Sequence, residues 1–390
     1  MAADWTELPP ELLETIAGKL TILIDYIRCR AVCVKWRSSI PRTPLHLPCQ
    51  LPWLMLPPPR THQTHRRSFF NLSTNKTHRL DLPEIPYHRR RCGSSHGWLV
   101  FLHESPEIYL LNPFTRSKIH LPPLSTFPNV IGFNFSDIGR EYSLRSPAGV
   151  VYTCNLKDMR NNFIKKVILS SSPSNDSDFV ALAILNRTGD LAFCKKGDKS
   201  WRCIEGSESY CEDVIYYNGL FYAVDKYGAI AICDVCGPSP RVSIMDTPPQ
   251  FGGDMQYLVR SMNQFLLVTR YLDTEYDEDL FEIFVYKTVL FKVYRLNLSN
   301  SNWEEVTNLG DQMLFLGENS SFALSASDFP GCEGNCIYYT DDYSESNYDD
   351  APWDHDLGIY NLEDGTIETF PCYHSPSGWP PPIWITPNAC

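Results

Sequence analysis

The feature that most constrains the fold is a series of short apolar segments separated by turn residues, which recurs from residue 94 onward. In 214–235 two apolar segments flank Asn218-Gly219, a dipeptide typical of a tight β-hairpin turn. Groups of three or four short strands at intervals of about 40–60 residues are typical of a β-propeller, in which each group forms one blade. Comparable groups of segments occupy 94–124, 180–204, 265–306 and 336–370.

The composition agrees with many short strands and a large core. The 390 residues include 30 prolines and 13% aromatic residues, and 43% are hydrophobic. The chain after residue 68 has room for six or seven blades at about 45–55 residues each. A β-sandwich or an irregular barrel is the alternative that the same segments allow.

The N-terminal region follows a different pattern. Its apolar residues recur at the spacing of one helix face, namely Leu8, Leu12, Leu13, Ile16 and Leu20. Two further short helices are expected before Pro41, which ends the helical region. A unit of about 40 residues cannot bury enough surface to be stable alone. It is therefore either a helical cap on the β-rich body or an apolar module that binds a groove on another protein.

The order of residues in this N-terminal region resembles an F-box. The resemblance implies that the region binds the Skp adaptor of a cullin-RING ubiquitin ligase. Val34 departs from the pattern, because many family members have a small polar or basic residue at that position. The matching phrases are Leu8-Pro9, Leu12-Leu13, Ile16, Leu20, Arg30-Ala31-Val32-Cys33 and Trp36-Arg37. The residues that would make or support the adaptor contact are Leu8, Pro9, Leu12, Leu13, Ile16, Leu20, Ile27, Val32, Cys33 and Trp36.

The rest of the chain resembles the C-terminal domain of plant F-box proteins of the KIB type, which has a kelch-like character. The resemblance implies an all-β propeller. The expected fold class is α+β multidomain, with a small all-α F-box module followed by an all-β propeller of about six or seven blades. The expected boundaries are 1–45 for the F-box module, 46–68 for a proline-rich basic linker that docks on the body, and 69–390 for the propeller. The matching phrases are Ser95-His96-Gly97-Trp98-Leu99, Leu111-Asn112-Pro113-Phe114, the run 335–342 and the run 381–387.

Charge is unevenly distributed along the chain. The net charge of −12 argues against nucleic-acid binding through the whole surface. The stretches 272–282 and 340–356 hold six and seven acidic residues, with no basic residue, and such stretches are usually solvated loops. Aromatic residues beside charges are common where proteins recognise one another. The candidate target-binding residues are therefore Tyr271, Tyr276, Tyr343, Tyr348 and Trp353.

The sequence predicts a soluble intracellular protein. The N-terminus lacks the features of a signal peptide, and no apolar run approaches the roughly 20 residues that span a membrane. We therefore expect a location in the nucleus, the cytoplasm or both, with reduced cysteines and with neither a membrane nor a nucleic acid as partner.

No catalytic, metal or cofactor site is expected. The sequence contains no nucleophile elbow, phosphate-binding glycine loop or HExxH helix. Cys233 with Cys236, and Cys332 with Cys336, have unequal spacings and are more typical of free thiols than of zinc ligands. The basic run 88–91 is either a plain basic loop or an element of nuclear import or anion contact.

Together these features predict a substrate-recognition subunit of an SCF-type cullin-RING ubiquitin ligase. Its partners would be the Skp adaptor, through it the cullin-RING scaffold, and an unidentified protein target. Such a subunit has no catalytic group and acts by bringing the target close to the transfer machinery. One alternative is a propeller scaffold without ligase function, with the helices as a cap. Another is a glycosidase-like enzyme, which would need paired carboxylates on one propeller face.

Overall fold

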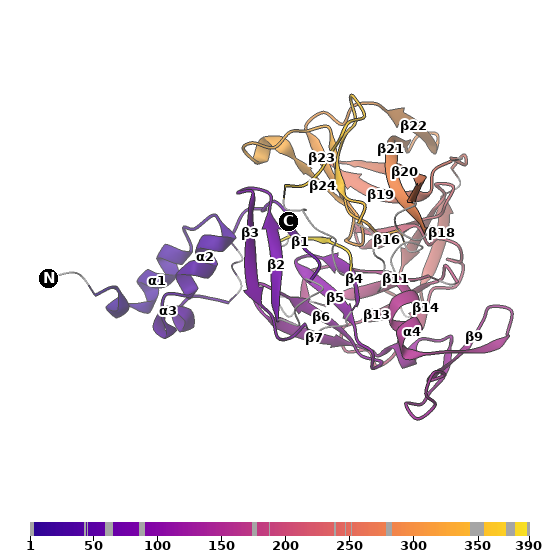
Figure 1. Cartoon of the computed structure of the whole chain (residues 1–390), viewed down its shortest axis with the longest axis horizontal. Coiled ribbons are helices and arrows are strands. Elements are labelled where there is room, and N and C mark those ends of the chain that lie inside the picture. The colour runs from indigo at the N-terminus through magenta and orange to yellow at the C-terminus, as the bar shows by residue number, and fades with distance from the viewer. Residues whose placement is uncertain are drawn as a thin grey trace.

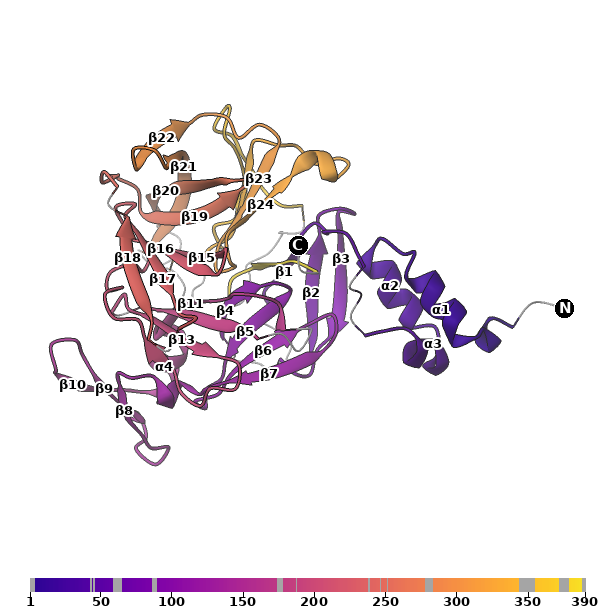
Figure 2. The ribbon, with the colours of Figure 1, turned by 180° about the vertical axis from the view of Figure 1, so that it is seen from behind.

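The computed structural model divides into a helical module and a larger β body (Figure 1). The module projects from the side of the body that carries β2 and β3, and the view from behind shows the same arrangement (Figure 2). For 275–277 and 283–285 only the backbone is described. The described residues are 4–42, 44, 46–58, 65–85, 90–173, 178–186, 188–237, 239–245, 247–250, 252–277, 283–343, 355–371 and 379–387.

The helical module contains three short α-helices, as the apolar spacing predicts. They are α1 (Pro10–Ala17), α2 (Leu23–Arg30) and α3 (Val34–Ser39), preceded by the 3-10 helix η1 (Trp5–Glu7). Pro10 opens α1 at a position where the missing N–H has no helical partner to lose. Apolar residues bury one side of each helix against the others, which stabilises helices too short to persist alone.

The described part of the body contains six sheets of four or five strands, arranged as the blades of a β-propeller. The sequence prediction of a propeller with six or seven blades is therefore confirmed. Blade 1 contains β28 (Ile383–Ile385), β1 (Trp53–Met55), β2 (Arg66–Asn71) and β3 (Lys76–Asp81). Blade 2 contains β4 (Arg90–Ser95), β5 (Trp98–Leu102), β6 (Ile108–Asn112) and β7 (Ser117–Leu121). Blade 3 contains β11 (Ile164–Leu169), β12 (Val180–Leu185), β13 (Leu191–Lys195) and β14 (Arg202–Cys203).

Blades 4 and 5 are antiparallel like the first three, whereas blade 6 contains the parallel pair β23 and β25. Blade 4 contains β15 (Asp213–Tyr217), β16 (Leu220–Val224), β17 (Ile230–Asp234) and β18 (Arg241–Met245). Blade 5 contains β19 (Met255–Ser261), β20 (Gln264–Asp277), β21 (Ile283–Asn297) and β22 (Asn302–Val306). Blade 6 contains β24 (Phe322–Ser325), β23 (Gln312–Leu316), β25 (Cys336–Tyr339), β26 (Gly358–Asn361) and β27 (Ile367–Glu368), with η5 (Ala326–Asp328) after β24.

The two ends of the body meet in blade 1, which closes the ring. Strand β1 pairs with β2 on one side and with β28 on the other, with Leu54 opposite Phe70 and Trp384. The stretch 46–68 therefore supplies one strand of the sheet and the beginning of β2, in addition to connecting the module to the body. Strand β1 is completely buried, because it is an inner member of its sheet.

A three-stranded sheet interrupts the series of blades between blades 2 and 3. It consists of β8 (Val130–Phe133), β9 (Tyr142–Arg145) and β10 (Val151–Cys154), with η2 (Leu124–Thr126) before it and α4 (Leu156–Asn162) after it. The sheet extends away from the ring in both ribbon views (Figures 1 and 2).

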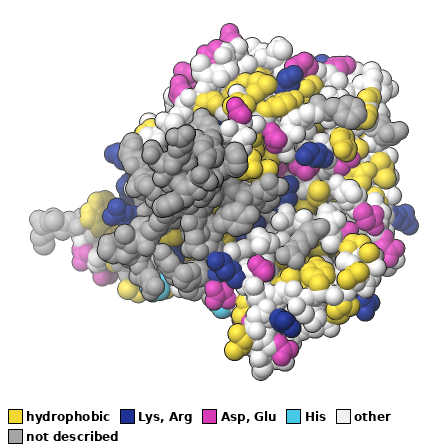
Figure 3. Space-filling view, turned by 45° about the vertical axis from the view of Figure 1, so that its right-hand side comes forward, with side chains coloured by type: hydrophobic (Ala, Val, Ile, Leu, Met, Phe, Trp, Pro, Cys, Tyr) yellow, Lys and Arg dark blue, Asp and Glu magenta, His cyan; other side chains and the backbone are white. Residues whose placement is uncertain are grey.

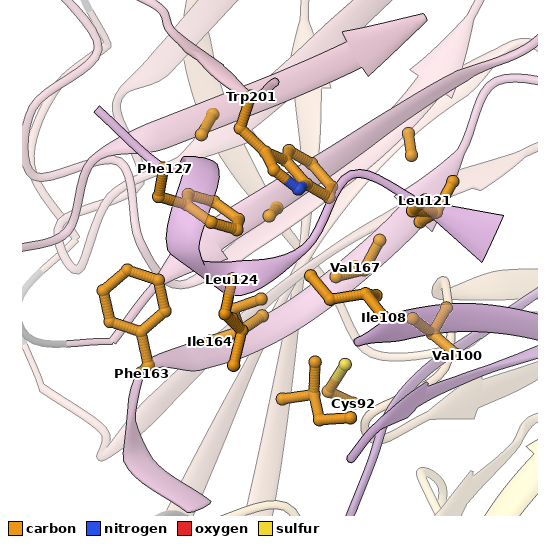
Figure 4. Packing of buried hydrophobic residues seen from close by; sticks show 14 of the residues in the cluster. Cys92, Val100, Ile108, Leu121, Leu124, Phe127, Phe163, Ile164, Val167 and Trp201 are labelled. Atoms are coloured by element: carbon orange, nitrogen blue, oxygen red, sulfur yellow. The ribbon is translucent and has the colours of Figure 1, made fainter. Parts of the chain in front are cut away.

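The hydrophobic core lies between neighbouring blades. In the cluster between blades 2 and 3, Trp201 stacks on Phe127 with ring centroids 4.6 Å apart, and its indole N–H donates to the Pro122 carbonyl at 2.8 Å (Figure 4). Val100 and Ile108 from blade 2 meet Val167 from blade 3 in the same cluster. Side chains on both faces of the inner strands are therefore buried, as in β5 and β6, which explains why many of these strands have continuous apolar sequences.

The structure confirms the predicted hairpin and corrects two local expectations. Asn218 and Gly219 both have positive φ and join β15 to β16. The acidic stretch 272–282 is not a loop at its start, because β20 continues to Asp277 and pairs with β21 up to Ile283. The basic run 88–91 is not a solvated loop at its end, because Arg90 and Arg91 are buried in β4; its first two residues lie outside the described part of the chain.

The described cysteines are mostly free thiols, including Cys233, Cys236, Cys332 and Cys336. Cys49 is disulfide-bonded, which differs from the expectation that all cysteines are reduced. Within the described residues, no three His, Cys, Asp or Glu side chains are grouped so that they could hold a metal ion. None of the helices in that part of the chain combines the length and apolarity needed to cross a bilayer.

Candidate functional site

The helical module has a small core of its own. Leu13 and Ala17 of α1 and Tyr26 of α2 are at most 2% exposed, and Ile40 joins them at the end of α3. The Tyr26 hydroxyl donates a hydrogen bond to the Pro41 carbonyl at 2.8 Å. The module thus has an interior of its own. Four further apolar side chains pack against it, namely Leu8, Leu20, Cys29 and Trp36.

Several large apolar side chains of the module face solvent. Leu12 and Ile16 lie one helical turn apart on the outer side of α1 and are 50% and 40% exposed. Val32, between α2 and α3, is 57% exposed. We call Leu12, Ile16 and Val32 the outer apolar set. Exposed apolar side chains grouped on one small unit are typical of a protein-binding surface.

The other residues predicted from the F-box resemblance, apart from Pro9, are buried or half-buried within the module. Leu13 lies inside the module, and the Cys33 thiol accepts a hydrogen bond from the Trp36 backbone N–H at 3.5 Å at the start of α3. The Trp36 indole N–H donates to the Trp5 carbonyl at 3.1 Å. Pro9 is exposed, whereas Leu8, Leu20, Ile27, Cys33 and Trp36 are half-buried.

Three exposed apolar residues of the module were missed by the sequence reasoning. They are Trp5, Ile22 and Val34, which are 65%, 49% and 80% exposed. Trp5 lies in η1, Ile22 precedes α2 and Val34 begins α3. Helix periodicity identifies residues on one face of a continuous helix, and it carries no signal for side chains at helix ends and turns.

The module is attached to the propeller through a surface that does not include the outer apolar set. Ile24 of α2 packs against the buried cluster of blades 1 and 2. The Gln50 side-chain amide donates to the Thr21 carbonyl at 2.9 Å, and the Arg42 guanidinium donates to the Thr115 carbonyl. The outer apolar set therefore stays accessible while the module is docked on the body.

A network of buried charges connects the inner strands of the propeller. The Lys166 ammonium of β11 lies 2.7 Å from the Asp213 carboxylate of β15, and both side chains are at most 4% exposed. The second oxygen of Asp213 accepts hydrogen bonds from the Ser321 hydroxyl at 2.5 Å and from the Leu258 N–H at 3.2 Å. One carboxylate thus joins elements of blades 3, 4, 5 and 6.

A second buried cation lies between blades 5 and 6. The Arg270 guanidinium contacts the carboxylates of Asp342 and Asp356 at 3.1 and 2.8 Å. It also donates to the Thr288 hydroxyl and the Tyr257 hydroxyl. Burial opposes its charge, but Tyr257 and the two carboxylates together hold the pKa of Arg270 well above its ordinary value.

This site corrects the expectation that 340–356 is a solvated acidic loop. Asp342 and Asp356 are ion-pair partners of a fully buried arginine, and burial raises the pKa of Asp342. Residues 344–354 lie outside the described part of the chain. The number of acidic residues in a stretch of sequence cannot identify such partners, because Arg270 is 72 residues from Asp342 and 86 residues from Asp356.

A third buried ion pair lies beside the first network. The Arg90 guanidinium is 3.6 Å from a Glu318 carboxylate oxygen, and both side chains are 9% exposed. Burial raises the pKa of Glu318 to about 7, and the attraction of Arg90 and Arg91 does not offset this effect. Carboxylates that are each paired with a cation in this way are typical of structural ion pairs.

Two of the five predicted target-binding aromatics have described side chains. Tyr271 is half-buried on β20, with the Lys292 ammonium 6.0 Å from its ring centroid. Tyr343 is half-buried and packs against Tyr286 of β21, with ring centroids 4.8 Å apart. The Tyr276 side chain, Tyr348 and Trp353 lie outside the described residues. The contact of these aromatics with a target stays a prediction.

The face of the molecule in Figure 3 carries both signs of charge among its described residues. On the face in Figure 3, acidic and basic side chains are interspersed over the described surface, with apolar side chains between them. A mixed surface of this kind favours recognition through shape and local contacts over long-range attraction.

The helical module and the closed ring of blades define a propeller protein with an added N-terminal helical module. The body matches the model of the KIB1-4 β-propeller over residues 69–361. The chain belongs to this family, and it is a plant F-box protein with a KIB-type propeller.

Named relatives cover nearly the whole chain. F-box protein SKIP23 of Arabidopsis thaliana is 31% identical, over 99% of this chain and 96% of that protein. F-box protein At2g17036 of the same plant is 28% identical, over 98% of this chain and 95% of its own length. Among solved structures, TolB from Acinetobacter baumannii aligns with 92% of this chain and 72% of its own, at 11% identity and a TM-score of 0.39.

Proposed function

We propose that this chain is the substrate-recognition subunit of an SCF-type cullin-RING ubiquitin ligase. In this role the F-box module in 1–45 binds the Skp adaptor, 46–68 joins the module to the body, and the propeller in 69–390 binds a protein target in the nucleus or cytoplasm. The chain supplies proximity and orientation, and other subunits carry out ubiquitin transfer.

The observation that carries the proposal is the outer apolar set. Leu12, Ile16 and Val32 are exposed on a module whose core is already filled and whose attachment to the propeller uses other residues. Covering these side chains with a partner would remove apolar area from water, which is the main driving force of most protein association. If the helices were only a cap, their apolar side chains would be expected to pack against the propeller, and Leu12, Ile16 and Val32 are exposed to solvent instead.

The direct test is adaptor binding by the double variant Leu12→Ala, Ile16→Ala. Full burial of a Leu or Ile side chain is worth about 1.5–3 kcal/mol, so covering the exposed half of both is worth about 2 kcal/mol. This loss corresponds to a roughly 30-fold increase in Kd, measured by calorimetry with purified Skp adaptor.

Ile138→Ala is the matched control, because Ile138 is 91% exposed and lies in the turn between β8 and β9, away from the module. It should bind the adaptor like the unaltered chain. Unchanged adaptor affinity in the double variant would refute the proposed contact.

A further inference from the structure

The sheet of β8, β9 and β10 projects from the ring between blades 2 and 3 (Figure 2). Its inner face anchors it to the body, because Tyr142, Leu144 and Cys154 are buried in the cluster between these two blades. The other face of the sheet and the outer edge of β10 take no part in closing the ring. Segments that a scaffold holds in place without needing them for its own closure are common sites of binding.

Strand β10 (Val151–Cys154) is the last strand of this sheet. Among the described residues it pairs only with β9, with Val151 opposite Arg145 and Thr153 opposite Ser143. Lysine and proline, which proteins use to block a strand edge against further pairing, are absent from β10. The edge of β10 is therefore available to another strand.

The register shows which backbone groups lie at this edge. The Arg145 N–H donates to the Asn129 carbonyl at 2.8 Å, on the side of β9 that faces away from β10. Arg145 and Val151 are therefore a non-hydrogen-bonded pair. Such pairs alternate with hydrogen-bonded pairs in an antiparallel ladder, so Thr153, two residues further on, belongs to a non-hydrogen-bonded pair as well. The N–H and C=O groups of Val151 and Thr153 thus point away from β9, toward the outer edge.

The side chains at this edge also suit an added strand. Val151 is 54% exposed, and Thr153 is exposed on the same face of the sheet. Val150, which is 62% exposed, comes directly before the strand. All three residues are β-branched, and β-branched side chains pack well against a neighbouring strand.

Basic side chains accompany the edge. Arg145 is exposed on the same face as Val151 and forms no ion pair with the described residues. Lys157 is exposed in the first turn of α4, which follows β10 directly. The whole chain has a net charge of −12, so this edge differs in sign from the protein as a whole.

The acidic side chains near the edge already have hydrogen-bond partners. The buried Glu141 carboxylate accepts from the Gly139 N–H at 2.8 Å and from a second backbone N–H at 3.2 Å. The Asp158 carboxylate accepts from the Asn155 side-chain amide at 3.0 Å. Asp137 is exposed, but it lies in the turn between β8 and β9, at the opposite end of β9 from Arg145. The edge is therefore complementary to an acidic residue on a partner.

We propose that β10 accepts an extended segment of a partner protein as an additional strand of this sheet, with an acidic residue of the segment beside Arg145. Hydrogen bonds to the backbone of Val151 and Thr153 supply affinity, and the acidic residue supplies selectivity. Neighbouring strands lie about 4.8 Å apart, so the added strand lies about 10 Å from β9, which an arginine and a glutamate side chain can bridge across Val151. That the partner is the ligase target rests on the proposed function, whereas strand addition itself does not.

Two short peptides, GTVEVTVG and GTVKVTVG, test this proposal on the full chain. Both alternate β-branched residues as a strand does, and they differ only in the charge of one residue. In a ligand-observed NMR titration the acidic peptide is expected to have a Kd of about 1 mM or tighter. The basic peptide should bind about three- to tenfold more weakly, because an attractive pair with Arg145 becomes a repulsive one. Hydrogen exchange in 150–154, followed by mass spectrometry, should slow when the acidic peptide is bound.

The variant Thr153→Pro removes the outward N–H that an added strand needs. Proline is tolerated on an edge strand when its nitrogen faces solvent, and the melting temperature shows whether the variant is folded. It should weaken the acidic peptide at least about fivefold, whereas the matched control Thr153→Val keeps the N–H and should bind like the unaltered chain. Arg145→Glu changes only an exposed side chain and should reverse the preference, so that the basic peptide binds more tightly.

Four results would each overturn the proposal: no binding of the acidic peptide to the unaltered chain, equal affinity for both peptides, unchanged binding in folded Thr153→Pro, or an unreversed preference in Arg145→Glu. None of these substitutions lies in the helical module, so the affinity for the Skp adaptor should be the same in all of them. A failure of strand addition and a failure of the adaptor contact are therefore seen in separate measurements.

Discussion

The ion pair between Lys166 and Asp213 offers the sharpest test of how this propeller is held together. Asp213 is fully buried and accepts hydrogen bonds from Lys166, Ser321 and two backbone N–H groups. The variant Asp213→Ala would leave the Lys166 ammonium in the interior without a countercharge. Removing one partner of a buried ion pair costs about 3–5 kcal/mol of folding stability.

The double variant Lys166→Met, Asp213→Ala removes both charges together. The remaining penalty comes from Ser321 and the backbone groups that lose their acceptor, and it should be about 1–3 kcal/mol. The double variant is therefore expected to be more stable than Asp213→Ala alone. If the two substitutions acted independently, their costs would add and the double variant would be the less stable one.

Urea unfolding followed by circular dichroism measures these free energies. The control is Glu304→Ala, which breaks an ion pair with Arg295 of similar length (3.0 Å) on the surface, where both side chains are more than 40% exposed. That variant should leave the urea midpoint unchanged. A loss below about 1 kcal/mol for Asp213→Ala, or a double variant less stable than the single one, would contradict the assigned role.

Three further predictions concern the pH response, the module and the closure of the ring. Burial raises the pKa of Glu318 from 4.5 to about 7, so the folded chain binds its proton more tightly than the unfolded chain, and Glu318 lowers stability as pH rises from 4.5 to 7. Glu318→Gln should remove this slope in urea titrations and be more stable than the unaltered chain at pH 8 by up to about 3 kcal/mol; a slope that persists in the variant would contradict this. Deleting 1–45 should leave a propeller that melts in one cooperative transition by calorimetry, because β1 begins only at Trp53; loss of that transition would favour the helices as a cap. Leu54→Ala, at a fully buried position between β2 and β28, should cost about 2–5 kcal/mol in urea unfolding, and a cost below 1 kcal/mol would show that this strand does not close the ring.

Much of the architecture could be predicted from local sequence. The spacing of Leu12, Leu13 and Ile16 identifies a helix because side chains on one helix face recur every three to four residues. Leu8 and Leu20, which the same spacing predicts on this face, lie outside α1. Asn218-Gly219 identifies a hairpin because both residues tolerate positive φ. These signals arise between residues close together in the chain, so no knowledge of the tertiary fold is needed to read them.

The position of each apolar residue relative to solvent could not be predicted in the same way. Leu12 and Leu13 are adjacent in the sequence and chemically identical, yet Leu12 is half exposed and Leu13 fully buried. The difference depends on where Tyr26 and Ile40 pack, and therefore on contacts among all three helices. The exposed surface that supports the proposed function is thus a tertiary property.

The sequence by itself determined that this chain combines short N-terminal helices with a repeating β body, because helix spacing and turn chemistry are local. Only the tertiary structure decided the roles of the charges, because an ion pair forms between elements that the chain brings together from distant positions. Asp342 and Asp356 lie in an acidic stretch that is typical of a solvated loop, and the fold instead places them around the buried Arg270. A carboxylate in water and a carboxylate beside a buried cation have the same sequence letter, and only the surrounding structure distinguishes them.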